Sequence, residues 1–225
     1  MMRKTGGGRM QDVLQEALRC LGMTQEEPET VREVGRTVQM LRQTQKPKYL
    51  YRVFPLERTQ TGLFLGGVML PGKTAETLLR ECETAALLCC TLGFGFDAML
   101  RTAQSRDMAQ AVLLDACGSA CVEAGCDEAE EELSARFPGK FRTDRFSPGY
   151  GDLPLSWQTE LCRLLDVQRQ LGVHLNDAML MTPSKTVTAV IGLSDTEQRA
   201  RIRGCAYCSF AENCAFRKRG MLCET

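Results

Sequence analysis

The first part of the chain carries two helical patterns of apolar residues. Residues 11–22 and 28–44 place apolar side chains three or four positions apart, which is the spacing of an amphipathic helix. The polar QKPK after the second range ends its pattern. We therefore expect an N-terminal helical arm over residues 1–46. The apolar stripe of its second helix consists of Val31, Val34, Val38 and Leu41.

The next segment changes to a β pattern. KYLYRVFPLE and GLFLGGVML are strand-like, and the short polar RTQT between them predicts a hairpin. The PGKT that follows marks a turn, after which a helix begins at Thr74 or Thr77. AALLCCTLG is apolar throughout, so its pattern fits a buried strand or the end of a helix.

A long helical pattern occupies the middle of the chain, from Phe96 to about Phe137, with interruptions near SRDM and AGCD. FPGKFRTD is a loop, and residues 155–172 form another helix. HLNDAMLMTPSKTVTAVIGLS predicts two strands joined at PSK. One face of the long helix carries small residues that allow close packing, namely Ala111, Asp115, Gly118, Ala120 and Ala124.

Interleaved helices and hairpin-like strands favour an α+β fold, with a twisted, largely antiparallel sheet flanked by helices, over a parallel wound sheet. We expect this domain to span residues 47–198, between the helical arm and a cysteine-rich tail over residues 199–225. A Gly-x-Gly in TLGFGFD is typical of nucleotide-binding turns, but it has only two glycines, and Asp115 lies in a helical pattern instead of ending the next strand.

Composition narrows the possible partners. The 28 basic residues equal the 28 acidic ones, which argues against a nucleic acid or an anionic membrane as the main partner. The basic, glycine-rich start is not followed by an apolar stretch, and nowhere does an apolar run reach the ~18 residues of a membrane-spanning helix. We expect a soluble, cytoplasmic protein that works without membrane or nucleic acid.

The 12 cysteines of this 225-residue chain fall into two groups. A chain of this size does not need a disulfide scaffold, so thiols or metal ligands are expected. Cys117, Cys121 and Cys126 approach the Cys-x3-Cys-x2-Cys loop that binds the iron–sulfur cluster of radical S-adenosylmethionine enzymes. The last spacing here is four residues instead of two, and core packing explains the first two cysteines better. Core packing is also expected for the cysteines in apolar surroundings, which are Cys20, Cys82, Cys89, Cys90 and Cys162.

The second group forms a polar tail, GCAYCSFAENCAFRKRGMLC. Its four thiols, which lie within 19 residues, suit tetrahedral zinc or an iron–sulfur cluster, and reduced thiols on a flexible end are the alternative. The neighbouring Arg217, Lys218 and Arg219 would offset the charge of such a centre or face an acidic partner. The expected metal ligands are Cys205, Cys208, Cys214 and Cys223.

The turn RFSPGY, residues 145–150, combines a guanidinium fork suited to a carboxylate with a Pro-Gly turn and a phenol. These groups could hold a zwitterionic, partly aromatic small molecule. A surface arginine beside a structural turn is the simpler alternative.

The order of this turn, the helix ending LLDVQRQLGVHL and the strands around MTPSKTVTAVIG resembles the S-adenosylmethionine-binding activation domain of cobalamin-dependent methionine synthase, and in particular its free-standing relatives. The resemblance is specific over residues 145–192 and looser over about 47–140. The resemblance implies that S-adenosylmethionine (AdoMet) is the cofactor. It also implies that the arginine binds the methionine carboxylate of AdoMet and that the turn lines the binding site. The implied cofactor-binding residues are Arg145, Ser147, Gly149 and Tyr150.

The family also uses an acidic residue, for which Asp97 and Glu123 are the candidates here. Cobalamin-carrying domains bind cobalt with Asp-x-His-x-x-Gly, but the residue two before His174, the only histidine, is Gly172. No nucleophile or base is tied to His174 by spacing, so no catalytic side chain is expected. We expect the cobalamin to be carried by a partner.

The resemblance implies an activation subunit that supports reductive methylation, and thus reactivation, of cob(II)alamin in a partner cobalamin-dependent methionine synthase. The subunit would be a component of that methyltransferase, in methionine biosynthesis, with flavodoxin or ferredoxin as a possible electron donor. The alternative is an iron–sulfur electron-transfer or corrinoid-reducing protein that acts on a corrinoid methyltransferase. A third reading is a binding module that keeps the fold without AdoMet.

Overall fold

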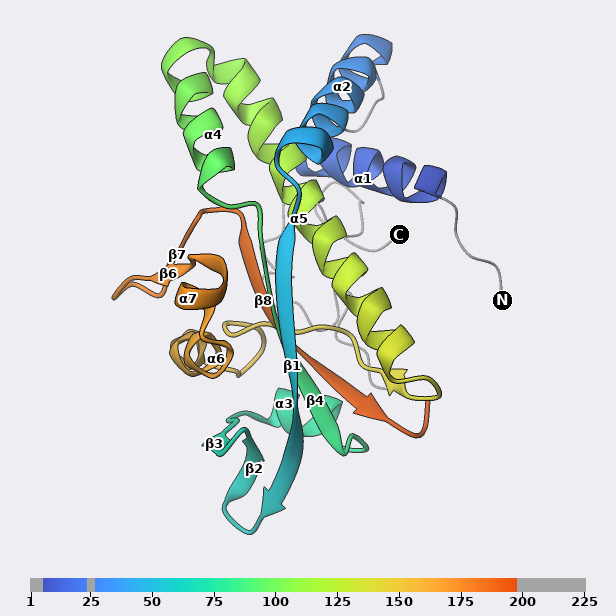
Figure 1. The fold of residues 1–225 in the computed structure, drawn as a ribbon, viewed down its shortest axis with the longest axis vertical. Coiled ribbons are helices and arrows are strands. Elements are labelled where there is room, and N and C mark those ends of the chain that lie inside the picture. The colour runs from blue at the N-terminus through green and yellow to red at the C-terminus, as the bar shows by residue number, and fades with distance from the viewer. Residues whose placement is uncertain (1–5, 24–26, 198–225) are drawn as a thin grey trace.

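The computed structural model describes residues 6–23 and 27–197, and its centre is a six-stranded sheet (Figure 1). The strands follow the order β3-β2-β1-β4-β8-β5, and every neighbouring pair is antiparallel. This confirms the predicted α+β class with a largely antiparallel sheet. The strands are β1 (Lys48–Thr59), β2 (Gly62–Leu65), β3 (Val68–Met69), β4 (Thr84–Thr91), β5 (Phe141–Arg142) and β8 (Thr186–Ser194).

Helices cover both faces of the sheet and enclose two apolar clusters. On one face, α1 (Gly6–Cys20), α2 (Pro28–Thr44), α4 (Phe94–Arg106) and α5 (Met108–Arg136) contribute to the first cluster. The second cluster, on the other face, is built by α3 (Lys73–Leu78), the 3-10 turn η1 (Leu155–Trp157), α6 (Gln158–Leu165) and α7 (Val167–Leu171). Figure 1 shows α5 as the long helix that runs beside the central strands.

The apolar run AALLCCTLG forms β4, one of the two central strands of the sheet. Its side chains alternate between the clusters: Leu88 and Cys90 join the first, whereas Leu87 and Cys89 join the second. Both faces of the strand are therefore buried, which explains why its sequence shows no polar alternation.

The predicted hairpin over β1 and β2 is confirmed by their antiparallel pairing, and α2 begins and ends where the pattern predicts. The long helical stretch divides at Asp107, whose carboxylate accepts hydrogen bonds from the amides of Ala109 and Gln110 and caps α5. The expected interruption at AGCD is wrong, because α5 continues through it. A Cβ on Gly125 would lie 2.5 Å from Cβ of Pro47, so this glycine serves close packing and does not end the helix.

Two strands flank PSK, as predicted, but they do not pair with each other. The strand before PSK is β7 (Met181–Thr182), which pairs with β6 (His174–Leu175), while β8 pairs with β4 and β5. Both edges of β8 are thus occupied by other segments. The helix expected over residues 155–172 is divided into η1, α6 and α7, with Asp166 in the left-handed region at φ 54°.

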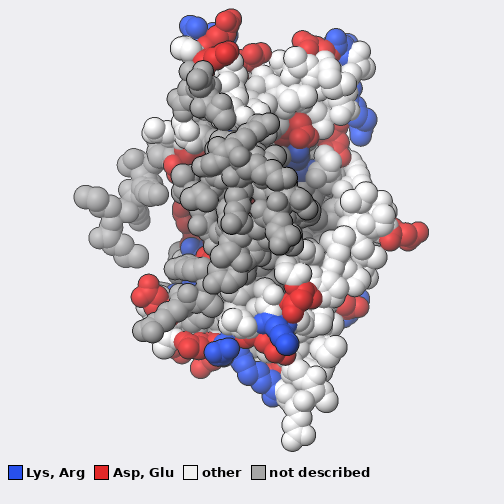
Figure 2. Space-filling view, turned by 180° about the vertical axis from the view of Figure 1, so that it is seen from behind, with Lys and Arg blue, Asp and Glu red and all other residues white. Residues whose placement is uncertain are grey.

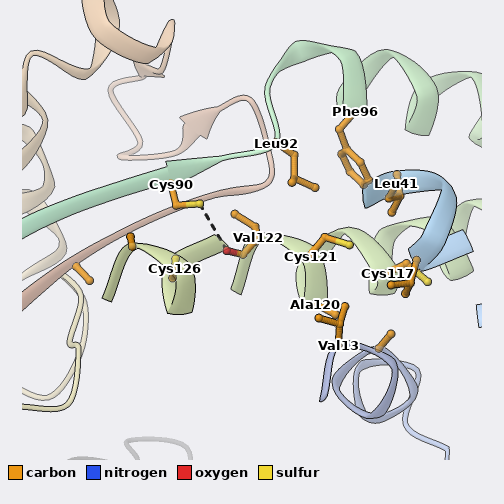
Figure 3. Packing of buried hydrophobic residues seen from close by; sticks show 14 of the residues in the cluster. Val13, Leu41, Cys90, Leu92, Phe96, Cys117, Ala120, Cys121, Val122 and Cys126 are labelled. Carbon is orange, nitrogen blue, oxygen red and sulfur yellow. Dashed lines mark hydrogen bonds between the residues drawn. The ribbon is translucent and has the colours of Figure 1, made fainter. Parts of the chain in front are cut away.

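Most of the cysteines in the described part of the chain are packing residues. Cys82, Cys89, Cys90 and Cys162 are buried, as predicted. Cys117, Cys121 and Cys126 are also buried, along α5, and in Figure 3 the thiol of Cys90 points to the carbonyl oxygen of Val122, 3.6 Å away. The prediction for Cys20 is wrong, because it is exposed at the last residue of α1 beside Glu16.

Within the described ranges, no helix is both long and apolar enough to span a membrane.

Candidate functional site

The segment before and within the RFSPGY turn continues from β5 along the same edge of β8. After β5, the amide of Thr143 donates to the carbonyl of Gly192, and Phe146 exchanges two backbone hydrogen bonds with Val190. The hydroxyl of Ser147 then donates to the carbonyl oxygen of Thr188 at 2.7 Å. The turn is therefore anchored to the sheet by backbone pairing, which fixes the direction in which Arg145 leaves it.

Arg145 projects to α5, where three carboxylates surround its guanidinium. Nη2 donates to Glu123 at 2.6 Å, and Nη1 donates to Asp127 at 2.7 Å and to Glu130 at 2.5 Å. Glu130 also forms an ion pair with Arg142 on β5. We call these five side chains the α5 charge cluster. Because it holds three carboxylates and two guanidinium groups, its net charge is −1.

Burial and charge act in opposite directions on Arg145, whose side chain is 13% exposed. Burial would lower the pKa of the guanidinium, but the carboxylates of Glu123 and Glu130 outweigh it and raise the pKa. Arg145 is therefore a permanent cation. Of its three partners, Asp127 is the most exposed, at 63%, so it is the one that a ligand carboxylate could replace with the least rearrangement.

The rest of the turn is compact and faces the second cluster. The amide of Tyr150 donates to the carbonyl of Ser147, and the amide of Gly149 donates to the carbonyl of Leu153 at 2.8 Å. Gly149 has φ +91°, a conformation that favours glycine. The half-buried Tyr150 packs against the second cluster, whereas Arg145 contacts α5. The structure thus brings the four predicted residues onto one anchored turn, but the two large side chains contact different layers.

The two acidic candidates have different positions. Glu123 belongs to the α5 charge cluster and contacts Arg145 directly. Asp97, which is buried, accepts hydrogen bonds from the amide and the hydroxyl of Ser184 and so holds the loop before β8. Of the two, only Glu123 is bonded to a predicted site residue.

Sequence reasoning missed Asp127, Glu130 and Arg142. A signal was present, because Glu123, Asp127 and Glu130 are spaced by four and three residues and therefore share one face of a helix. Their meeting with Arg145 depends on how α5 packs beside the sheet edge.

Figure 2 shows acidic and basic side chains interspersed over the described residues of the molecule's rear face.

In the part of the chain that the structure describes, no group of three or more His, Cys, Asp or Glu side chains is arranged to hold a metal ion. The predicted metal ligands of the tail, Cys205, Cys208, Cys214 and Cys223, lie outside the described residues.

Residues 80–203 match the model of the family described as vitamin B12 dependent methionine synthase, activation domain. This match covers more than half of the chain and includes both the RFSPGY turn and the α5 charge cluster. The chain belongs to this family. The activation-domain resemblance noted from the residues of the turn, the following helix and β8 is thereby confirmed.

A solved structure supports the same fold. It is described as the crystal structure of the MetH reactivation domain bound to AdoHcy, and it is similar to this chain with a TM-score of 0.62 at 14% identity. The similarity covers 92% of this chain and 83% of that chain, so the activation-domain fold extends beyond the family match. A comparison with curated proteins finds no match.

Proposed function

We propose that this chain is an AdoMet-binding activation subunit that supports reductive methylation of cob(II)alamin in a partner cobalamin-dependent methionine synthase. The observation that carries the proposal is the RFSPGY turn, which lies inside the segment that matches the activation-domain family and is hydrogen-bonded along the edge of β8. The neutral net charge of the chain leaves recognition to local groups such as these.

The α5 charge cluster fits the charges of AdoMet. The ligand carries a carboxylate, an ammonium and a sulfonium, so it has a net positive charge, whereas the cluster has a net charge of −1. Arg145 would bind the carboxylate through its fork after Asp127 moves towards solvent. Glu123, which is 40% exposed, would then offer its oxygens to the ammonium group.

The turn would supply shape more than charge. Ser147 holds the backbone close to β8, Gly149 closes the turn onto Leu153, and Tyr150 would present an aromatic wall on which an adenine could stack. With AdoMet held here, its methyl group would pass to the partner's cobalamin after that cobalamin has accepted one electron, and S-adenosylhomocysteine would be left on this chain. The chain itself binds and orients the methyl donor, and proximity is its contribution to the rate.

Cobalamin itself is assigned to the partner. His174 is exposed on β6 with Gly172 two residues before it, so the residues around it do not form the cobalt-binding motif. Flavodoxin or ferredoxin is the proposed electron donor, because the reaction needs one electron at low potential. Purification of the isolated chain with stoichiometric cobalamin would contradict this division of roles.

Calorimetry with AdoMet on anaerobically purified chain tests the proposal. We expect saturable binding with one site per chain. A second experiment adds the chain to an oxidised cobalamin-dependent methionine synthase without its own activation domain, together with a reductant and AdoMet, and measures recovered turnover. Absence of AdoMet binding, or binding without recovery of turnover, would contradict the proposed function.

A further inference from the structure

The PGKT segment at the start of α3 meets the residues directly after the RFSPGY turn through Asp152. Oδ2 of Asp152 accepts a hydrogen bond from the amide of Lys73 at 2.7 Å, and Oδ1 accepts one from the amide of Thr74 at 3.0 Å. The residue at the helix start, Gly72, has no side chain with which to cap α3. Asp152 supplies this cap from a segment 79 residues away in the sequence from Lys73.

Two glycines allow the backbones to approach each other. A Cβ on Gly72, which has φ +103°, would lie 2.6 Å from Oδ1 of Asp152. A Cβ on Gly151, which has φ +58°, would lie 2.5 Å from Oγ1 of Thr74. Each turn therefore provides a glycine where the other provides a polar side chain. We call this arrangement of Gly72, Thr74, Gly151 and Asp152 the clasp.

The clasp holds the second end of the proposed ligand-binding turn. Its first end is fixed to β8 by the paired backbones of Phe146 and Val190. Between these two anchors, the amide of Leu153 donates to the carbonyl of Tyr150 at 3.1 Å and closes the turn. The position of Tyr150 is thus determined by β8 on one side and by α3 on the other.

We infer that Asp152 is a positioning residue for AdoMet binding: it holds the turn of Gly149 and Tyr150 against α3 and acts on the ligand only through that turn. This inference rests on the proposed function. A preformed turn binds more tightly than a mobile one, because the ordering has been completed before the ligand arrives.

The test compares the full chain with three variants by AdoMet calorimetry and thermal unfolding. We expect Asp152→Ala to weaken AdoMet binding by about threefold to thirtyfold, the range for loss of a helix cap. Asp152→Asn should recover most of the affinity, because its amide oxygen still accepts a hydrogen bond from the α3 amides. Asp107→Ala is the matched control, since Asp107 caps α5 with bonds of 3.0 and 3.1 Å to two amides outside the proposed site.

Asp107→Ala should lower the melting temperature and leave AdoMet affinity unchanged. Equal affinity of parent and Asp152→Ala would overturn the inference, and so would equal weakening by Asp107→Ala, because general destabilisation would then explain the effect. Hydrogen exchange at Lys73 and Thr74 gives a second readout: unchanged protection in Asp152→Ala would show that the clasp is not needed. Failure of the parent chain to bind AdoMet would contradict the proposed function together with the inference. The outcomes described above, in which the parent binds AdoMet, would contradict the inference alone.

Discussion

Arg145 and Glu130 form an ion pair in which each side chain is only 13% exposed, although the residues are separated by 15 positions in the sequence. Glu130 also bonds to Arg142, so a single carboxylate joins the proposed ligand-binding arginine to β5. Both side chains are largely buried, so solvent compensates little for a lost partner. The charges therefore depend on one another.

The first prediction concerns Arg145. Arg145→Ala should weaken AdoMet binding by about 30-fold to 1000-fold, since a charge-assisted bidentate contact is lost. It should also lower stability, because three carboxylates are left together. Arg145→Lys keeps the charge among them but loses the planar fork, so it should preserve the melting temperature better and still weaken binding. Calorimetry and thermal unfolding measure the two effects.

Arg142→Ala is the control for Arg145. It removes a guanidinium that also bonds to Glu130 but lies on β5, outside the turn. AdoMet affinity should fall far less than in Arg145→Ala, because Arg142 contacts the proposed site only through the shared carboxylate of Glu130. If Arg142→Ala and Arg145→Lys weaken binding equally, the role of Arg145 reduces to the charge balance of the cluster.

The second prediction concerns the packing of α4 on α5. A Cβ on Gly118 would lie 2.3 Å from Cζ of Phe96, a fully buried side chain. Gly118→Ala should therefore lower the free energy of unfolding by about 1–3 kcal/mol through overpacking. Gly35→Ala in α2 is the matched change, because nothing lies within 4 Å of the added Cβ. It should raise stability by about 0.5–1 kcal/mol. Denaturant unfolding compares them, and equal effects would contradict the close contact.

The third prediction follows from the pKa of Asp152. Backbone hydrogen bonding to Thr74 lowers this pKa from its ordinary value of 3.8. The unfolded chain therefore takes up the proton at a higher pH than the folded chain does, and the contribution of Asp152 to stability is fully present above pH 3.8. As the pH falls through the folded pKa, the contribution is lost.

Thermal unfolding of parent and Asp152→Asn over a pH series measures this loss. The difference in melting temperature should be largest near neutral pH and should shrink as the pH falls below 3.8, where the aspartate becomes neutral as well. A difference that stays constant over the series would show that charge has no role in the clasp.

The fourth prediction concerns the tail, where Cys205, Cys208, Cys214 and Cys223 are proposed to bind one metal centre, an iron–sulfur cluster in preference to zinc. Anaerobic protein should then be brown, with a broad absorption at about 400 nm from thiolate-to-iron charge transfer. Cys205→Ser should lower the metal content, whereas Cys20→Ser, at an exposed thiol on α1, should not. One zinc in colourless protein would reverse the metal assignment, and four freely titrating thiols without metal would refute both.

The sequence by itself determined the local elements and the family. The apolar stripe of α2, the hairpin over β1 and β2 and the order of the RFSPGY turn, helix and strand were all readable, because each depends on neighbouring residues. The predicted site residues of the turn were implied by the resemblance to the activation-domain family. Their role in binding AdoMet stays a prediction.

Only the tertiary structure decided what lies between distant segments. β4 was ambiguous because burial on both faces removes the alternation that distinguishes a strand. The sequence around Gly125 predicts an interruption of the helix, whereas in the structure this glycine allows α5 to pack closely against Pro47. Likewise, only the tertiary structure shows that Arg145 bonds to α5 and that Asp152 bonds to α3. Such contacts depend on how layers pack, and spacing along the chain carries no information about which layers will meet.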